Sequence, residues 1–136
     1  MENTCNTIEE KTSLYWELQT GAETGWDYSS RWLIDMKDGS NHGTLKDTKA
    51  RPIIPVDPNS ILAEKARIIS NFYRQYFCNQ ESAIINHKSI SENIIEGIEN
   101  VLWNEEEVTW FRIDLLNEKQ RPYFTPSYML SMCVFV

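Results

Sequence analysis

The stretch DPNSILAEKARIISNFYRQYF, residues 57–77, decides the fold class that this chain predicts. Asp57 is predicted as a helix N-cap and Pro58 as the first helical residue, where the missing N–H of proline costs nothing. Apolar residues then recur at helical spacing to about Phe77. The predicted buried stripe is Leu62, Ala66, Ile69, Tyr73 and Phe77. Asp57 is therefore interpreted as a cap and not as a catalytic carboxylate.

A second long helix is predicted from about Glu81 to Leu102. Its apolar positions at near-helical spacing are Ile84, His87, Ile94, Ile98 and Val101. Gly97 lies inside this helix at a cost of about 1 kcal/mol relative to Ala, for which close packing of another helix is the interpretation.

Shorter elements complete the predicted fold. A capping box at Thr7–Glu10 predicts a helix to about Leu18, with Leu14 and Leu18 on its buried face. Gly21 and Gly25 punctuate an irregular segment that follows. The polar segment 37–52 and the tail from residue 117 are predicted as loops, with a short strand over 108–115 between the second long helix and the tail. The predicted fold class is all-α, with two long helices, one short helix and long loops.

Length and composition exclude several classes of protein. The 136 residues suit one domain, and 41% of them are apolar, which is enough for a core. The net charge of −7, without a Lys/Arg cluster, argues against a nucleic acid or an anionic membrane surface as a partner. Cys5, Cys78 and Cys133 lie far apart, so no zinc-type spacing is present and no metal site is predicted. The polar N-terminus does not resemble a signal peptide, and residues 132–136 are too few to span a bilayer.

The densest polar and aromatic segment is residues 23–32, Glu-Thr-Gly-Trp-Asp-Tyr-Ser-Ser-Arg-Trp. An acid catalyst for glycoside cleavage must be protonated near neutral pH, and burial between aromatic rings raises the pKa of a carboxyl group. Asp27, between Trp26 and Tyr28, is the candidate. Gly25 would allow close approach of backbone to a substrate. The alternative is structural: Asp27 caps a helix, and Trp26 and Trp32 lie in the core.

Three blocks of the chain, in the same order, resemble the trehalase family of glycoside hydrolases. Residues 22–32 are similar to the family's Ala-Glu-Ser-Gly-Trp-Asp-Phe-Ser-Ser-Arg-Trp block, and residues 53–59 resemble its Ile-Ile-Pro-Val-Asp-Leu-Asn. Leu102-Trp-Asn-Glu-Glu106 with Asp114-Leu115 is similar to its Leu-Trp-Asn-Glu-Glu and Asp-Leu stretch. The resemblance covers roughly residues 14–124.

The resemblance implies a fold, a reaction and two site residues. The family fold is an (α/α)6 barrel of paired helices, so residues 1–136 are expected to form one partial catalytic domain, with a divergent tail at 125–136. The family hydrolyses the α,α-1,1 bond of trehalose to glucose with inversion. Its acid catalyst maps onto Asp27 and its substrate-contacting glycine onto Gly25. No metal or organic cofactor is implied, because two carboxylates and a water suffice.

The same comparison finds no counterpart of the family's general-base Glu. Two further family segments, a Tyr-Trp-Asp-Ser-Tyr block and an Arg-Pro-Glu segment, also have no match. The chain is therefore expected to be inactive on trehalose and marginally folded by itself, with apolar helix stripes facing water. The segment after Phe124 is interpreted as a truncated or misread end. Localisation stays open, because relatives are secreted, membrane-anchored or cytoplasmic.

Other polar residues have a structural reading beside a functional one. Glu23 is a surface carboxylate or a support for the site. Arg31 is expected to pair with an acidic neighbour and orient the loop rather than contact substrate. The run Glu105–Glu107 is expected as a solvated turn. His42 and His87 lie without a nucleophile or ligand set nearby. The rival to a trehalase fragment is a non-catalytic structural or sugar-binding remnant, and a third reading is an unrelated helical interaction domain.

Overall fold

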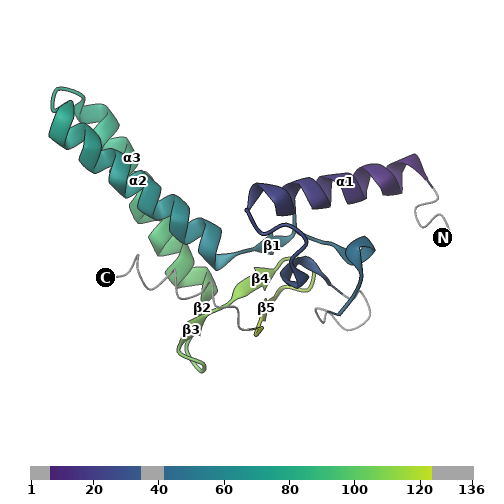
Figure 1. The fold of residues 1–136 in the computed structure, drawn as a ribbon. Coiled ribbons are helices and arrows are strands. Elements are labelled where there is room, and N and C mark those ends of the chain that lie inside the picture. The colour runs from purple at the N-terminus through teal and green to yellow at the C-terminus, as the bar shows by residue number, and fades with distance from the viewer. Residues whose placement is uncertain (1–6, 35–41, 124–136) are drawn as a thin grey trace. The chain divides into compact units, whose positions relative to one another are not determined.

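The computed structural model describes residues 7–34 and 42–123, and most of these are helical (Figure 1). The all-α prediction is confirmed to this extent, with short strands added. The chain divides into two compact units. Unit 1 comprises residues 1–54 with 114–119, and unit 2 comprises residues 55–113 with 120–136. The assignment of both units to one partial domain over 1–136 stays a prediction, and the tail 125–136 lies outside the described residues.

Unit 1 begins with helix α1, Ile8–Glu23. The capping box at its start is confirmed: the Thr7 hydroxyl accepts from the Glu10 N–H at 3.1 Å, and the Glu10 carboxylate accepts from the Thr7 N–H at 3.0 Å. The helix continues past the predicted end at Leu18. The prediction of an irregular segment is therefore wrong at Gly21, which lies inside the helix and faces the ring of Trp32. Its buried residues are Glu17 and Gly21, whereas Leu14 and Leu18 are half-buried.

The core of unit 1 is a cluster of four buried side chains, Trp32, Ile34, Ala50 and Ile53. It is built from short elements: 3-10 turns at Ser30–Trp32 and Leu45–Asp47, and strand β1, Ile53–Ile54. An isolated antiparallel bridge joins Leu33 to Thr48. The Lys49 N–H donates to the Trp32 carbonyl at 2.7 Å, so the segment 44–50 is tied to the segment that carries Trp32.

Unit 2 contains the two long helices, α2, Val56–Tyr76, and α3, Glu81–Gly97, which lie side by side as a helical hairpin (Figure 1). Helix α2 begins earlier than predicted, with Pro55 as its N-cap. The prediction that Asp57 is the N-cap is therefore wrong. Asp57 lies in the first turn and is fully buried, and a carboxylate there is favoured by the helix dipole.

The predicted buried stripe of α2 is confirmed at Ala66 and in part at Tyr73, which is half-buried, and it is wrong at its exposed members Leu62, Ile69 and Phe77. The buried residues are small or lie near the helix start: Val56, Asp57, Ser60, Ala63, Ala66 and Ser70. Leu62 is 53% and Ile69 39% exposed. The Ser70 hydroxyl donates to the Ile84 carbonyl of α3 at 2.9 Å, so small side chains allow the two helices to approach closely. The larger apolar residues lie on other faces of α2.

Helical structure continues from α3 through a π-helical segment, Ile98–Leu102. The predicted extent from Glu81 to Leu102 is thus confirmed, although Val101 is exposed and the buried Ser91 was not predicted. Close helix packing at Gly97 is a wrong interpretation, because a Cβ placed there would meet no atom within 4 Å. Gly97 instead immediately precedes the change from α- to π-helix.

Short strands follow. Strands β2, Trp103–Asn104, and β3, Thr109–Trp110, pair antiparallel. The predicted strand over 108–115 corresponds to β3 and to β4, Arg112–Asp114. The predicted loop from residue 117 is wrong at β5, Lys119–Arg121, which is a hydrogen-bonded neighbour of β4. None of the helices in the described part of the chain is long and apolar enough to cross a membrane.

Candidate functional site

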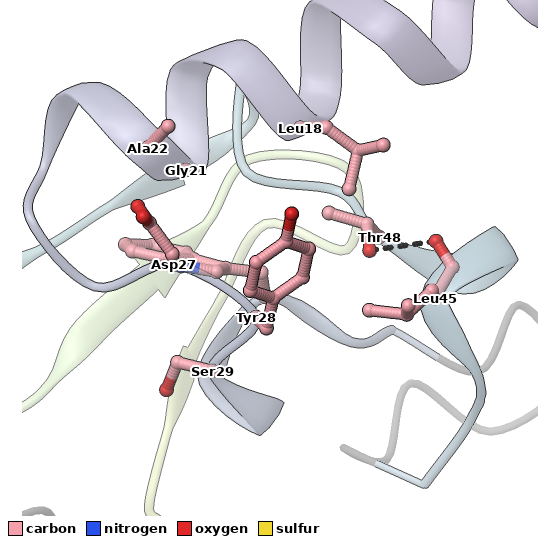
Figure 2. A pocket seen from close by; sticks show the side chains of 9 residues that line it. Leu18, Gly21, Ala22, Asp27, Tyr28, Ser29, Leu45 and Thr48 are labelled. Atoms are coloured by element: carbon pink, nitrogen blue, oxygen red, sulfur yellow. Dashed lines mark hydrogen bonds between the residues drawn. The ribbon is translucent and has the colours of Figure 1, made fainter.

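The segment that carries Asp27 lies over a small hollow in unit 1 (Figure 2). Its volume is about 60 Å³. The lining residues come from α1, from the loop after it and from the segment 45–48: Leu18, Gly21, Ala22, Asp27, Tyr28, Ser29, Trp32, Leu45 and Thr48. Pockets that enclose small ligands hold about 300–1,000 Å³. The hollow is therefore a depression beside the loop and does not enclose a disaccharide.

The end of α1 sets the start of this loop. Thr24 is the C-cap, and its hydroxyl donates to the Gly21 carbonyl at 2.6 Å. Gly25 follows with φ of +77°, the left-handed conformation that a helix C-terminus favours and that glycine adopts without strain. An added Cβ at Gly25 would meet no atom within 4 Å. Backbone geometry thus requires glycine here, and the space around it is open.

Asp27 does not cap a helix. The 3-10 turn at Ser30–Trp32 is capped by Ser29, whose hydroxyl accepts from the Arg31 N–H at 3.4 Å. The Asp27 side chain is instead directed toward α1, beside that of Tyr28 (Figure 2). The prediction of Asp27 as a cap is therefore wrong, although Trp32 lies in the core as that alternative expects, and the Asp27 carboxylate stands on the rim of the hollow.

Burial of Asp27 between its aromatic neighbours is also not observed. Asp27 is exposed, Tyr28 is 76% exposed and Trp26 37%. Neither of these two rings covers the Asp27 carboxylate. Tyr28 has φ of +55°, a left-handed conformation that costs a non-glycine residue about 1–3 kcal/mol. Residues held in such conformations cluster at functional sites, so this backbone supports a role for the segment.

Contacts from Trp32 and Arg31 hold the loop at residues 24–29 in place. Trp32 is only 2% exposed, and its indole N–H donates to the Trp26 carbonyl at 2.8 Å. The Arg31 guanidinium lies over the Trp26 ring, 4.2 Å from its centroid, and its Nε donates to the Ser29 hydroxyl at 3.2 Å. A cation over a tryptophan face is attracted by the ring's quadrupole. Arg31 thus contacts the loop through Trp26 and Ser29, while its pairing with an acidic neighbour stays a prediction.

The opposite wall rests on the turn at residues 44–48. The Thr48 hydroxyl donates to the Leu45 carbonyl at 2.8 Å. Asp47 accepts from both the N–H and the hydroxyl of Thr44, at 2.7 and 3.0 Å. These hydrogen bonds lower the pKa of the Asp47 carboxyl below its usual value, with the backbone N–H as the largest cause.

Glu17 is a buried carboxylate that the sequence reading missed. It lies on the inner face of α1, and its Oε2 accepts from the Arg51 N–H at 2.8 Å. This bond connects the helix to the segment before β1. The signal available in the sequence was spacing alone, since Glu17 and Gly21 are one turn apart on the same face.

The other candidates are not among the residues that line the hollow. Glu23 is exposed and accepts from Gln19 at 3.2 Å, and the run Glu105–Glu107 is exposed in the turn between β2 and β3, as expected. His42 is exposed, while His87 stacks on Tyr73 with 5.9 Å between centroids. Within residues 7–34 and 42–123, no group of three or more His, Cys, Asp or Glu side chains has the arrangement of a metal site.

Comparison with known proteins identifies the family. The trehalase family model matches residues 1–136. A trehalase from Apis mellifera is 42% identical over 126 residues, which cover 93% of this chain and 20% of that protein. The trehalase of Homo sapiens is 34% identical over 118 residues (87% and 19%), and a putative periplasmic trehalase of Escherichia coli O157:H7 is 28% identical over 124 residues (90% and 20%).

The chain belongs to the trehalase family. It spans about a fifth of the length of these relatives. The resemblance first seen in three blocks is therefore confirmed over nearly the whole chain.

Proposed function

We propose that the chain is a section of a trehalase catalytic domain and supplies its general acid, Asp27, to the hydrolysis of trehalose. The observation that carries the proposal is the placement of Asp27. Its carboxylate stands on the rim of a hollow, on a loop whose backbone is fixed by Gly25 and Tyr28 in left-handed conformations and by the Trp32 hydrogen bond. A catalytic acid must be accessible to substrate and held in one position.

The reaction requires two carboxyl groups and a water. Asp27 donates its proton to the glycosidic oxygen, which leaves with one glucose unit. At the same time the bond from this oxygen to C1 of the second glucose unit breaks. A carboxylate on the opposite face, about 6.5–9.5 Å away, takes a proton from the water that attacks C1. The products are one α-glucose from the leaving group and one β-glucose from the inverted centre. Gly25 contributes open backbone beside the substrate.

Several features support the expectation that residues 1–136 are inactive alone. Among the described residues, no second carboxyl group lines the hollow, and about 60 Å³ does not enclose the substrate. Asp27 is exposed to solvent, and neither Trp26 nor Tyr28 covers its carboxylate. In the longer enzyme, we infer, the remaining helices of an (α/α)6 barrel cover Asp27 and bring the base to it.

A hybrid enzyme tests this proposal. The matching section of the Apis mellifera trehalase is replaced by this chain's aligned residues, and glucose release from trehalose is measured. The hybrid is expected to be active, and Asp27→Asn to lower kcat by about 10²–10⁴-fold. With α-glucosyl fluoride, whose leaving group needs no proton, the Asp27→Asn hybrid is expected to keep most of its activity. Glu23→Gln is the matched control, since this nearby carboxylate is exposed and is expected to leave both rates unchanged.

Two outcomes would overturn the assignment. Equal losses on trehalose and on the fluoride would show that Asp27 does more than donate a proton to the leaving group. Unchanged hydrolysis of trehalose by the Asp27→Asn hybrid would remove Asp27 from the mechanism.

Proton NMR of the first products checks inversion, because retention would give two α-glucose molecules per turnover. Trehalose binding at the Asp27 loop of the 136-residue chain, without hydrolysis, would favour the sugar-binding remnant.

A further inference from the structure

A second hollow lies entirely within unit 2, at the start of the β2–β3 hairpin. It has a volume of about 260 Å³ and is lined by Glu99, Trp103 and Trp110. We call it the tryptophan hollow. Nothing in the proposed role of Asp27 uses these side chains, and the inference drawn from them does not depend on that role.

The hairpin places the two indoles together. Trp103 in β2 is directly opposite Trp110 in β3. Their ring centroids are 4.9 Å apart and their planes meet at 63°, an edge-to-face arrangement. In such a pair the edge of one ring lies on a face of the other, so the pair leaves the faces of the first ring uncovered. Both residues are half-buried, so aromatic surface remains at the hollow.

Polar side chains fix the hairpin in this form. The indole N–H of Trp103 donates to the Glu105 carboxylate at 2.7 Å, and the Asn104 side chain accepts from the Glu107 N–H at 2.8 Å. The amide of Gln120 donates to the carbonyls of Leu102 and Trp103 at 3.2 and 3.0 Å. The hollow is thus formed before any ligand arrives, which lowers the entropic cost of binding.

The third lining residue, Glu99, lies in the π-helical segment Ile98–Leu102. A π-helix has wider turns than an α-helix, and single turns of this kind recur at functional sites. Glu99 precedes Trp103 by four residues, so the π-turn sets this carboxylate beside the aromatic pair at the hollow. Glu99 is exposed and therefore accessible to a ligand from solvent.

We propose that the tryptophan hollow binds a single pyranose ring of a neutral saccharide. A pyranose presents C–H groups on its faces, which pack on an indole face, and hydroxyl groups at its edge, which donate to a carboxylate. The three lining residues supply both kinds of partner. The volume is just below the range of about 300–1,000 Å³ for drug-sized ligands, so one ring fits the hollow better than a longer chain.

The charge of the site selects against anionic ligands. Glu99 lines the hollow, Glu105 is bonded to one of its indoles, and the chain carries a net charge of −7. A nucleotide or a sugar phosphate is repelled by this field. An organic cation is the competing kind of ligand, since indole faces and carboxylates attract cations as well. Parallel titrations with a saccharide and with tetramethylammonium distinguish the two kinds of ligand.

NMR titration of the 136-residue chain, labelled with ¹⁵N, provides the test. Each indole N–H gives its own signal, and Trp→Phe variants assign the five signals. On addition of glucose or trehalose, the signals of Trp103 and Trp110 are expected to shift and saturate together. The signal of Trp16, which is exposed on α1, is the internal control and is expected not to move. Tetramethylammonium is titrated in parallel.

Variants then locate the site. Glu99→Gln, at an exposed position that should not affect folding, is expected to weaken saccharide binding, and Trp103→Ala to weaken it about tenfold, or ~1.4 kcal/mol. Asp27→Asn is expected to leave the saccharide-induced shifts of the Trp103 and Trp110 signals unchanged. Failure of the saccharide-site proposal is therefore distinguishable from failure of Asp27 as the acid. The proposal is overturned if no indole signal responds to up to about 50 mM saccharide, an affinity weaker than about 2 kcal/mol. It is also overturned if the shifts persist unchanged in Glu99→Gln, or if tetramethylammonium binds and saccharides do not.

Discussion

The indole N–H of Trp32 donates a 2.8 Å hydrogen bond to the backbone carbonyl of Trp26. This bond closes the loop that carries Asp27 and joins it to the core of unit 1, because Trp32 also packs against Gly21 of α1. The position of the candidate acid therefore depends on a buried side chain five residues later in the chain.

Trp32→Phe should separate packing from this hydrogen bond. The phenyl ring fills most of the space, but the Trp26 carbonyl loses its donor, which should lower stability by about 1–3 kcal/mol. In the hybrid enzyme we expect a lower thermal midpoint and a lower kcat for trehalose. Trp16→Phe, at an exposed position, is the matched control and is expected to change neither. A Trp32→Phe hybrid with full activity would show that the loop does not need this bond.

Gly25 and Gly97 should respond in opposite directions to the same substitution. Gly25 has φ of +77°, so Gly25→Ala is expected to destabilise by about 1–2 kcal/mol. Gly97 has φ of −62°, and an added Cβ meets nothing, so Gly97→Ala is expected to stabilise by up to about 1 kcal/mol. Urea unfolding of the two hybrid enzymes measures both values. A loss of stability in Gly97→Ala would indicate that the π-helical segment requires glycine before it.

Glu17→Ala should cost more stability than an exposed glutamate on the same helix. It removes the acceptor of the part-buried Arg51 N–H, and an intramolecular hydrogen bond contributes about 0.5–1.5 kcal/mol. Glu9→Ala, in the exposed first turn of α1, is the control, with an expected effect of about 0.5 kcal/mol or less. Thermal unfolding of the hybrid variants compares them. Equal effects at the two positions would contradict a connecting role for Glu17.

The turn at residues 44–48 should weaken at low pH. The pKa of Asp47 is lowered in the folded chain, chiefly by the Thr44 N–H and then by its hydroxyl. A lowered folded pKa gives a contribution that is present above the unfolded value of about 3.9 and is lost as pH falls through the folded value. NMR titration of the Asp47 carboxyl in the 136-residue chain measures this pKa. Thr44→Val removes only the hydroxyl and is expected to raise the pKa partway. An unchanged pKa in Thr44→Val would assign the whole shift to the backbone.

Local sequence signals predicted some ends of elements, although the end of α1 at Leu18 and the N-cap of α2 at Asp57 were predicted wrongly. The capping box at Thr7 and the extent of helix from Glu81 to Leu102 are confirmed, because each depends on a few neighbouring residues. The buried face of α2 was predicted wrongly. Helical periodicity marks apolar positions, but α2 has apolar residues on most of its circumference, and spacing does not tell which of them contact α3.

The candidate site shows the same division. Family blocks pointed to Asp27 and Gly25, and the left-handed φ of Gly25 agrees with a conformational need for glycine. Glu17 and the pairing of Trp103 with Trp110 were not predicted. Both depend on contacts between residues whose partners are set by the turns between them. Such contacts leave no periodic pattern in the sequence.

The two-sided nature of α2 has a consequence for its tolerance to variation. On the side toward α3, Ser60, Ala63 and Ser70 leave no room for larger side chains, so a saturation library should retain only small residues there. On the opposite side of α2, Leu62, Ile69 and Phe72 are exposed in the 136-residue chain. A saturation library of this chain should therefore retain almost any substitution at these three positions. In a full-length trehalase, the same three positions should accept only apolar residues. The difference between the two libraries would map, residue by residue, the surface of this section that the rest of the enzyme covers.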